Sequence, residues 1–100
     1  MEKHWREQVD PFFEELLPEF ERNLQTDSAR LDGLLQSGQL ADLGRIAHNY
    51  KGTAGYFGLT ELGRVALNLD AHCKAGDSAA AAAAVEAWLK IVIRLGLRAG

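Results

Sequence analysis

Apolar residues recur at helical spacing along almost the whole chain, and this periodicity constrains the fold more than any other feature. In segment 40–57 the apolar residues are three or four positions apart and share one helix face. These residues are Leu43, Ile46, Tyr50, Ala54 and Phe57. Valine, isoleucine and threonine are sparse, and no segment alternates apolar and polar residues as a half-buried strand does. The pattern predicts an all-α protein.

Short breaks rich in Gly, Ser and Asp divide the chain into four helical segments. We expect one from Asp10–Pro11 to the Ser37–Gly38 break, one from about Leu40 to Phe57, one from Thr60 to Ala75–Gly76, and one from Asp77 or Ser78 through Leu95. Residues 2–9 add a short helical turn. Because the connections are short, successive helices should be antiparallel neighbours. The sequence therefore predicts an up-and-down antiparallel four-helix bundle with a short extra N-terminal helix, as a single domain over residues 1–100.

Several residues mark the helix ends. Asp10 offers a capping carboxylate ahead of a proline at the first helical position. Pro18 predicts either a kink or two helices that meet there. Gly58 is suited to a left-handed helix end, and Thr60 is expected to cap the next helix.

The apolar faces of the other three segments predict the remaining core positions. These are Phe13, Leu17, Phe20, Leu24, Leu31 and Leu35 in the first segment, Leu62, Val65, Leu69 and Cys73 in the third, and Ala81, Val85, Trp88, Val92 and Leu95 in the last.

Composition excludes several classes of protein. A net charge of −3 with no basic run argues against a nucleic-acid partner, because phosphate backbones are bound by clustered Lys and Arg. Cys73 is the single cysteine, so no disulfide forms within the chain. The N-terminus lacks the apolar core of a signal peptide, and the longest apolar run, near 79–85, is far shorter than a membrane span. We therefore expect a cytoplasmic location.

His48 lies opposite the apolar face of segment 40–57. Each residue advances about 100° around a helix, which places four small residues within about 40° of His48. They are Ala41, Gly44, Gly52 and Gly55. Arg45 and Lys51 lie about 60° to either side of the histidine. The rotation predicts that His48 is exposed.

The glycines around His48 need an explanation, because each costs about 1 kcal/mol relative to alanine inside a helix. Close packing against a neighbouring helix is one explanation. The shared position of Gly44, Gly52 and Gly55 opposite the apolar face instead favours a bare surface on which another protein docks. Arg45 and Lys51 would keep the imidazole a neutral nucleophile and would attract and stabilise a phosphoryl group on it.

The run from His48 to Gly58, His-Asn-Tyr-Lys-Gly-Thr-Ala-Gly-Tyr-Phe-Gly, resembles the signature of histidine-containing phosphotransfer (HPt) domains of two-component signalling. The resemblance covers about residues 10–95. It implies that His48 is the phosphoacceptor through Nε2, that Lys51 helps to hold the phosphoryl charge and that Gly52 leaves room for a receiver domain. Asp70 stands where the family often has Glu or Gln facing the site, and we expect it at the docking surface with Gly44, Gly52 and Gly55.

The resemblance also implies a mechanism. A receiver domain with its own bound Mg²⁺ would transfer the phosphoryl group from its phospho-aspartate to His48, and a second receiver would later remove it. The chain has no Gly-rich nucleotide loop, so we expect a phosphoryl carrier that is not an enzyme and has no cofactor of its own. Expected partners are response-regulator receiver domains and a sensor or hybrid histidine kinase, with no nucleic acid and no membrane, and the protein is expected to be a monomer.

Two other functions fit the sequence less well. A helical module could bind a receiver domain or kinase as a scaffold or inhibitor without accepting phosphate, but it would not need both His48 and Lys51. A metal site is disfavoured because the Glu-x-x-His pairs of di-metal bundles are absent and His72 beside Cys73 is a weak ligand pair. His72 is expected at the edge of the core, and His4 lies near the chain end.

Overall fold

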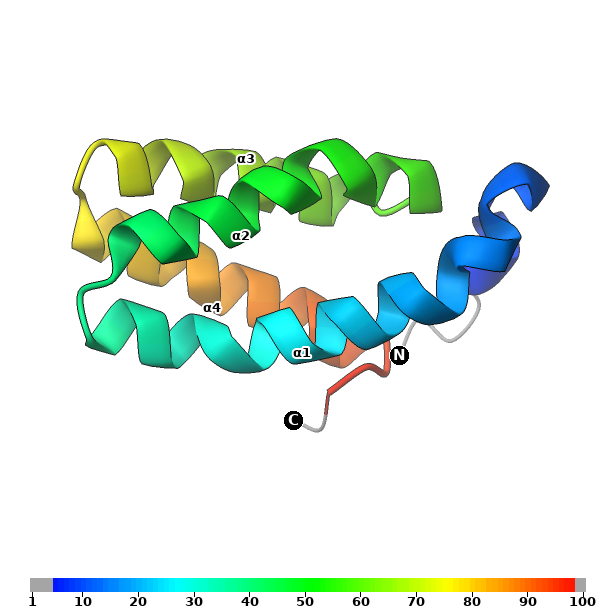
Figure 1. Ribbon diagram of the computed structural model, residues 1–100, viewed down its shortest axis with the longest axis horizontal. Coiled ribbons are helices and arrows are strands. Elements are labelled where there is room, and N and C mark those ends of the chain that lie inside the picture. The colour runs from blue at the N-terminus through cyan, green and yellow to red at the C-terminus, as the bar shows by residue number, and fades with distance from the viewer. Residues whose placement is uncertain (1–4, 99–100) are drawn as a thin grey trace.

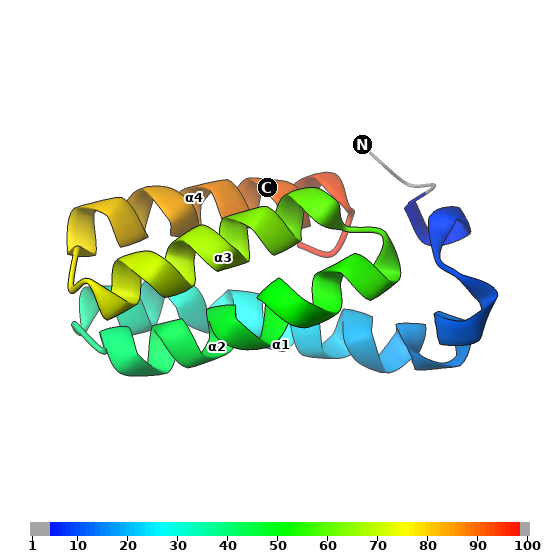
Figure 2. The same cartoon turned by 90° about the horizontal axis from the view of Figure 1, so that it is seen from above.

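Four α-helices form an antiparallel bundle in the computed structural model, which describes residues 5–98 (Figure 1). In chain order the elements are the 3₁₀ helices η1 (Trp5–Gln8) and η2 (Pro11–Leu16), then α1 (Leu17–Gln36), α2 (Leu40–Thr53), the 3₁₀ helix η3 (Ala54–Phe57), α3 (Thr60–Lys74) and α4 (Ser78–Arg94). The chain runs up and down through the bundle, and α3 lies between α2 and α4 (Figure 2). The predicted all-α class and bundle are confirmed. Within 5–98, no helix is both long and apolar enough to cross a membrane.

The first predicted helix is divided near Pro18. The carboxylate of Asp10 accepts a hydrogen bond from the Phe12 amide at 2.8 Å and so caps η2 as expected. The chain then changes from the tighter 3₁₀ turn to α1 at Leu17, with Pro18 in the first turn, where its missing N–H breaks no helical hydrogen bond. Of the two outcomes predicted for Pro18, a kink or two helices that meet, the structure shows the second.

The segment 40–57 also contains two elements. The α-helix α2 ends at Thr53, and η3 continues it to Gly58, whose φ of 74° is the predicted left-handed helix end. The prediction that Thr60 caps α3 is wrong. Leu59 is the residue before the helix, and its carbonyl accepts the Gly63 amide at 3.0 Å, so Thr60 is already helical. Burial of Leu59 in the core fixes the turn one residue earlier than a polar cap would.

The interior contains the predicted apolar faces, with Phe13, Leu17, Leu35, Val65 and Cys73 at its edge. The sequence pattern skips one turn of α1, between Leu24 and Leu31. The structure places Ser28 there, 1% exposed, and its hydroxyl accepts a hydrogen bond from the Trp88 indole Nε1 at 3.0 Å. Trp88 is fully buried, so this serine provides a polar partner that a leucine could not.

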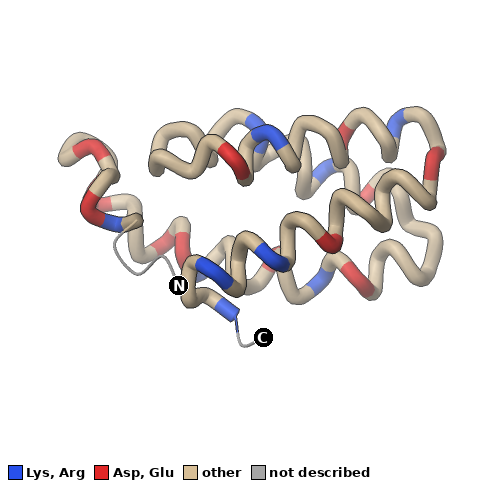
Figure 3. Tube along the Cα trace, turned by 180° about the vertical axis from the view of Figure 1, so that it is seen from behind, with Lys and Arg blue, Asp and Glu red and all other residues tan. Residues whose placement is uncertain are grey.

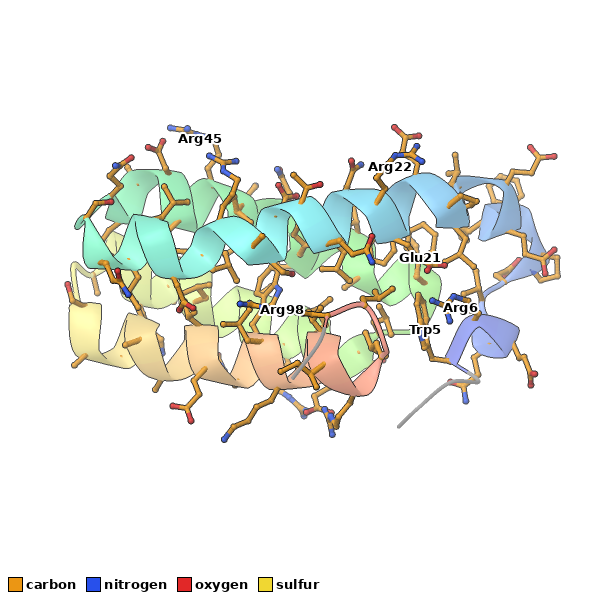
Figure 4. All side chains as sticks on the ribbon, turned by 90° about the horizontal axis from the view of Figure 1, so that it is seen from below. Trp5, Arg6, Glu21, Arg22, Arg45 and Arg98 are labelled. Atoms are coloured by element: carbon orange, nitrogen blue, oxygen red, sulfur yellow. The ribbon has the colours of Figure 1, made fainter. Side chains whose placement is uncertain are left out.

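The N-terminal segment covers one end of the bundle. The Trp5 indole donates to the Leu95 carbonyl at 3.2 Å, and the Arg6 guanidinium makes two hydrogen bonds to the Glu21 carboxylate, of 2.8 and 2.6 Å. Figure 4 shows Arg6 and Glu21 side by side at this end. The predicted short helical turn is therefore present as η1, while residues 2–4 of that prediction, His4 included, lie outside the described residues.

Replacement of Ser28 by alanine is expected to destabilise the bundle by about 1–3 kcal/mol, because the buried Trp88 N–H would lose its acceptor. Urea unfolding measures the loss. Thr26→Ala, which removes an exposed hydroxyl from the same helix, is the control and should change stability by less than about 0.5 kcal/mol. Equal stability of Ser28→Ala and the wild type would show that the hydrogen bond contributes nothing.

Candidate functional site

His48 lies on the exposed side of α2, near the middle of the segment 40–57. Its side chain is 61% exposed, whereas Leu43, Ile46 and Tyr50 on the opposite side are buried. The predicted exposure of His48 is confirmed. A rigid bundle helix thus presents the imidazole to solvent, with the buried face of the same helix holding it in place.

Helices α2 and α3 approach closely beside His48, at Gly44. A Cβ atom at Gly44 would lie only 3.1 Å from Cys73 Cβ on α3. Gly44 is buried, so the expectation that it belongs to an open docking face is wrong. The buried arc of α2 is wider than its apolar residues indicate, because α3 covers the side that carries Gly44 and Ala47. Gly44 serves the close packing of two helices.

This close approach places Asp70 of α3 under the exposed face of α2. The Asp70 side chain is 5% exposed, and one of its oxygens, Oδ2, has three neighbours. Lys51 Nζ lies 2.9 Å away, Lys74 Nζ 3.3 Å away and His48 Nδ1 3.5 Å away. Asp70 thus faces the site, as the resemblance implies, but its carboxylate is buried among side chains of its own chain and does not lie at an open surface. Asp70 links three residues of the site.

The charges around Asp70 favour its ionised form. The hydrogen bond from Lys51 holds the pKa of the Asp70 carboxyl below its usual value, burial opposes this effect, and Lys74 adds to it. An ionised carboxylate that faces Nδ1 favours the proton on that nitrogen. In a neutral ring the lone pair is then on Nε2. The site can present a nucleophilic nitrogen to a partner.

A comparison with protein families identifies the family to which this chain belongs. The sequence matches the Hpt domain family over residues 15–97. The chain belongs to this family. HPt domains carry phosphoryl groups in two-component signalling and interact with receiver domains and kinases. Comparisons with curated proteins and with solved structures gave no match.

Arg45 makes an ion pair away from the imidazole of this HPt domain. Its guanidinium donates to Asp42 Oδ1 at 2.8 Å, one turn earlier in α2, and its side chain is 71% exposed. Figure 4 shows Arg45 extending from the bundle into solvent. Exposed pairs of this kind are worth about 0.3–0.5 kcal/mol, so an anion bound at His48 could compete for Arg45.

Gly52 and Gly55 lie open, as predicted. A Cβ at either position would have no neighbouring atom within 4 Å. They line a hollow of about 570 Å³ that is bounded by Lys51 and, on α3, by Arg64 and Leu67. A second groove, of about 490 Å³, lies on the other side of Lys51 and contains His48. Both hollows are lined by residues of α2 and α3. Figure 3 shows that basic and acidic positions are interspersed along the whole tube.

Two further residues of the earlier predictions have structural roles. Burial, together with the negative charge of Asp70, raises the pKa of the Cys73 thiol, which therefore stays protonated against Gly44. His72 is half-buried at the edge of the core, as expected. Among residues 5–98, no three His, Cys, Asp or Glu side chains are arranged to hold a metal ion.

Sequence reasoning missed Lys74 and the partner of Tyr50. Lys74 is four residues after Asp70, the spacing at which an acid and a base meet on a helix, so that signal was available. Tyr50 donates its hydroxyl proton to Asp27 Oδ2 at 2.7 Å, and burial, followed by this bond, raises its pKa. Asp27 is 23 residues away on α1, so no local pattern reveals this contact.

Asp70 should make stability depend on acid pH. Because its pKa is lower in the folded chain than the ordinary 3.8, the unfolded chain takes up the proton first, and the contribution of Asp70 is lost as pH falls through and below that value. The free energy of unfolding, measured with urea at pH 7 and pH 3, should therefore drop less in Asp70→Asn than in the wild type.

Asp32→Asn, at an exposed position of α1, is the control and should follow the wild type. If Asp70→Asn showed the full wild-type drop between the two pH values, the lysines would not be stabilising the folded-state carboxylate.

Proposed function

We propose that this HPt domain accepts a phosphoryl group on His48 from the phospho-aspartate of a receiver domain and passes it to another receiver domain. The observation that carries the proposal is the arrangement of His48: a 61% exposed ring on a rigid helix, with Nδ1 facing a buried carboxylate. A static helix positions the nucleophile, and in-line transfer depends mainly on position and charge.

The transfer step follows from this geometry. The Nε2 lone pair forms the N–P bond while the bond between phosphorus and the aspartyl oxygen of the receiver breaks, which leaves the receiver with a free carboxylate. The proton on Nδ1 stays in place. The ring becomes positive as it donates its lone pair, and Asp70 Oδ2, 3.5 Å from Nδ1, lies where it stabilises that charge. Lys51 and Arg45 supply positive charge for the phosphoryl oxygens.

The proposal makes the protein a carrier between partners. Since its sequence has no Gly-rich nucleotide loop, the phosphoryl group must come from a partner, and we assign the Mg²⁺ to the receiver domain. A sensor or hybrid histidine kinase would feed the relay. HPt domains are typically cytoplasmic, and we propose the same location and a monomeric state for this one.

We propose the hollow beside Lys51 as the surface that admits the receiver domain. Gly52 and Gly55 leave backbone without side chains there, and Leu67 is 53% exposed at its edge. Arg64 adds a positive charge on the same rim, suited to an acidic group around the receiver active site. Leu67 and Arg64 thus offer an apolar contact and a positive charge beside Lys51, in the hollow next to the groove that contains His48.

His48→Gln is expected to abolish labelling. The wild type, mixed with Mg²⁺ and a receiver domain that carries radiolabelled phosphate on its aspartate, should acquire a label that is lost in acid and stable in base. His72→Gln is the matched control, because His72 is also on a bundle helix but lies at the core edge, and it should keep the label.

Label that persists in His48→Gln would remove the assignment of the phosphoacceptor. A wild type that binds the receiver domain but takes no label would favour the alternative, a scaffold or inhibitor without phosphotransfer.

Gly52→Gln is expected to slow transfer about tenfold or more, because an obstructing side chain would keep the reacting atoms from their separation of about 3.5 Å. Its fold should be intact, since a Cβ at Gly52 meets no atom within 4 Å. Gly33→Gln has equally free space on α1 and controls for the change in helix propensity. Rapid-quench labelling measures the rates, and an unchanged rate in Gly52→Gln would place docking elsewhere.

A further inference from the structure

Two lysines share one oxygen of the buried carboxylate. Lys51 Nζ is 2.9 Å from Asp70 Oδ2 and Lys74 Nζ is 3.3 Å from the same atom. The lysines come from different helices, Lys51 from α2 and Lys74 from the last turn of α3. A single negative charge thus has two positive partners, which is more than neutralisation requires.

The resting position of Lys51 conflicts with its proposed role. Its ammonium group is bonded to Asp70, yet a dianionic phosphoryl group on His48 needs that charge on its own oxygens. If Lys51 left and Lys74 were absent, only the positive ring of the phosphorylated His48, with Nδ1 3.5 Å away, would offset the charge of the 5% exposed carboxylate. Removal of one partner from a buried pair is strongly unfavourable. The departure of Lys51 must therefore be compensated at Asp70.

We infer that Lys74 is the standby counter-ion of Asp70, which lets Lys51 move from the carboxylate to the phosphoryl group when His48 is phosphorylated. Lys74 reaches Oδ2 from an (i, i+4) position on the same helix, and its side chain is 68% exposed. It therefore keeps its bond to Asp70 whichever partner Lys51 takes. No covalent bond changes in this exchange; one ammonium group moves between two anions. The inference rests on the proposed function.

Lys74→Ala should shorten the half-life of the phosphohistidine about fivefold, a change within the range of coupling between residues of one charge network. Lys51 would then be retained by Asp70. Lys74→Arg should restore the half-life, because a guanidinium also pairs with the carboxylate. Lys90→Ala is the matched control: Lys90 also pairs at (i, i+4), with Glu86 on α4, and it should have no effect. A wild-type half-life in Lys74→Ala would overturn the inference.

The same substitution in an Asp70→Asn background separates two roles of Lys74. With no charge to neutralise at position 70, Lys74→Ala should have no further effect on the half-life. An equal, fivefold loss in both backgrounds would mean that Lys74 binds the phosphoryl group directly, and it would overturn the role as counter-ion.

Unfolding of the unphosphorylated protein tests the redundancy of the two lysines without any label. Lys51→Ala and Lys74→Ala should each lower the urea midpoint slightly, because the other lysine still compensates Asp70, and the double variant should lose more than the sum. Additive losses would overturn the inference. Failure of the proposed function is distinguishable from failure of this inference. The wild type would then take no label, whereas the unfolding of the two single variants and the double variant would still show how the charge of Asp70 is compensated.

Discussion

The close approach of α2 and α3 at Gly44 is the constraint on which the site depends. A Cβ atom at this position would lie 3.1 Å from Cys73 Cβ, so a larger residue would push the helices apart. Three residues before Cys73, Asp70 reaches Lys51 and faces the ring of His48. If the helices separated there, the carboxylate would lose its position beneath the histidine. The cost of a glycine within a helix is thus offset by the assembly of the site.

Burial separates the charges that organise this site from those that only surround it. The Asp70 carboxylate is almost inaccessible, so its ion pairs are poorly screened and determine where two lysines lie. The pair between Arg45 and Asp42 is exposed and contributes little, which leaves Arg45 free to exchange partners. The fold thus places one buried charge network beside the ring of His48, with the exposed cation Arg45 one turn away.

Much of the architecture could be predicted because it depends on short-range rules. The 3.6-residue period identifies the buried face of α2 and hence the exposure of His48, and Pro18 and Gly58 mark changes that their own backbone chemistry imposes. The period could not reveal Ser28 in the core, since its partner Trp88 is 60 residues away. It likewise misplaced the start of α3, where burial of Leu59 replaced the expected cap at Thr60.

The sequence by itself determined the helical class, the exposed histidine and the likeness to HPt domains, because helical rotation and a contiguous motif are local properties. Only the tertiary structure decided what each neighbour of His48 does. Gly44 and Gly52 lie about 40° to either side of His48 on α2, yet one packs against α3 and the other is open. Whether a glycine of α2 is buried or open depends on which side of α2 is covered by α3, and that follows from the packing of the whole bundle. The same packing buries the carboxylate of Asp70 beside His48, although the sequence placed Asp70 at the docking surface.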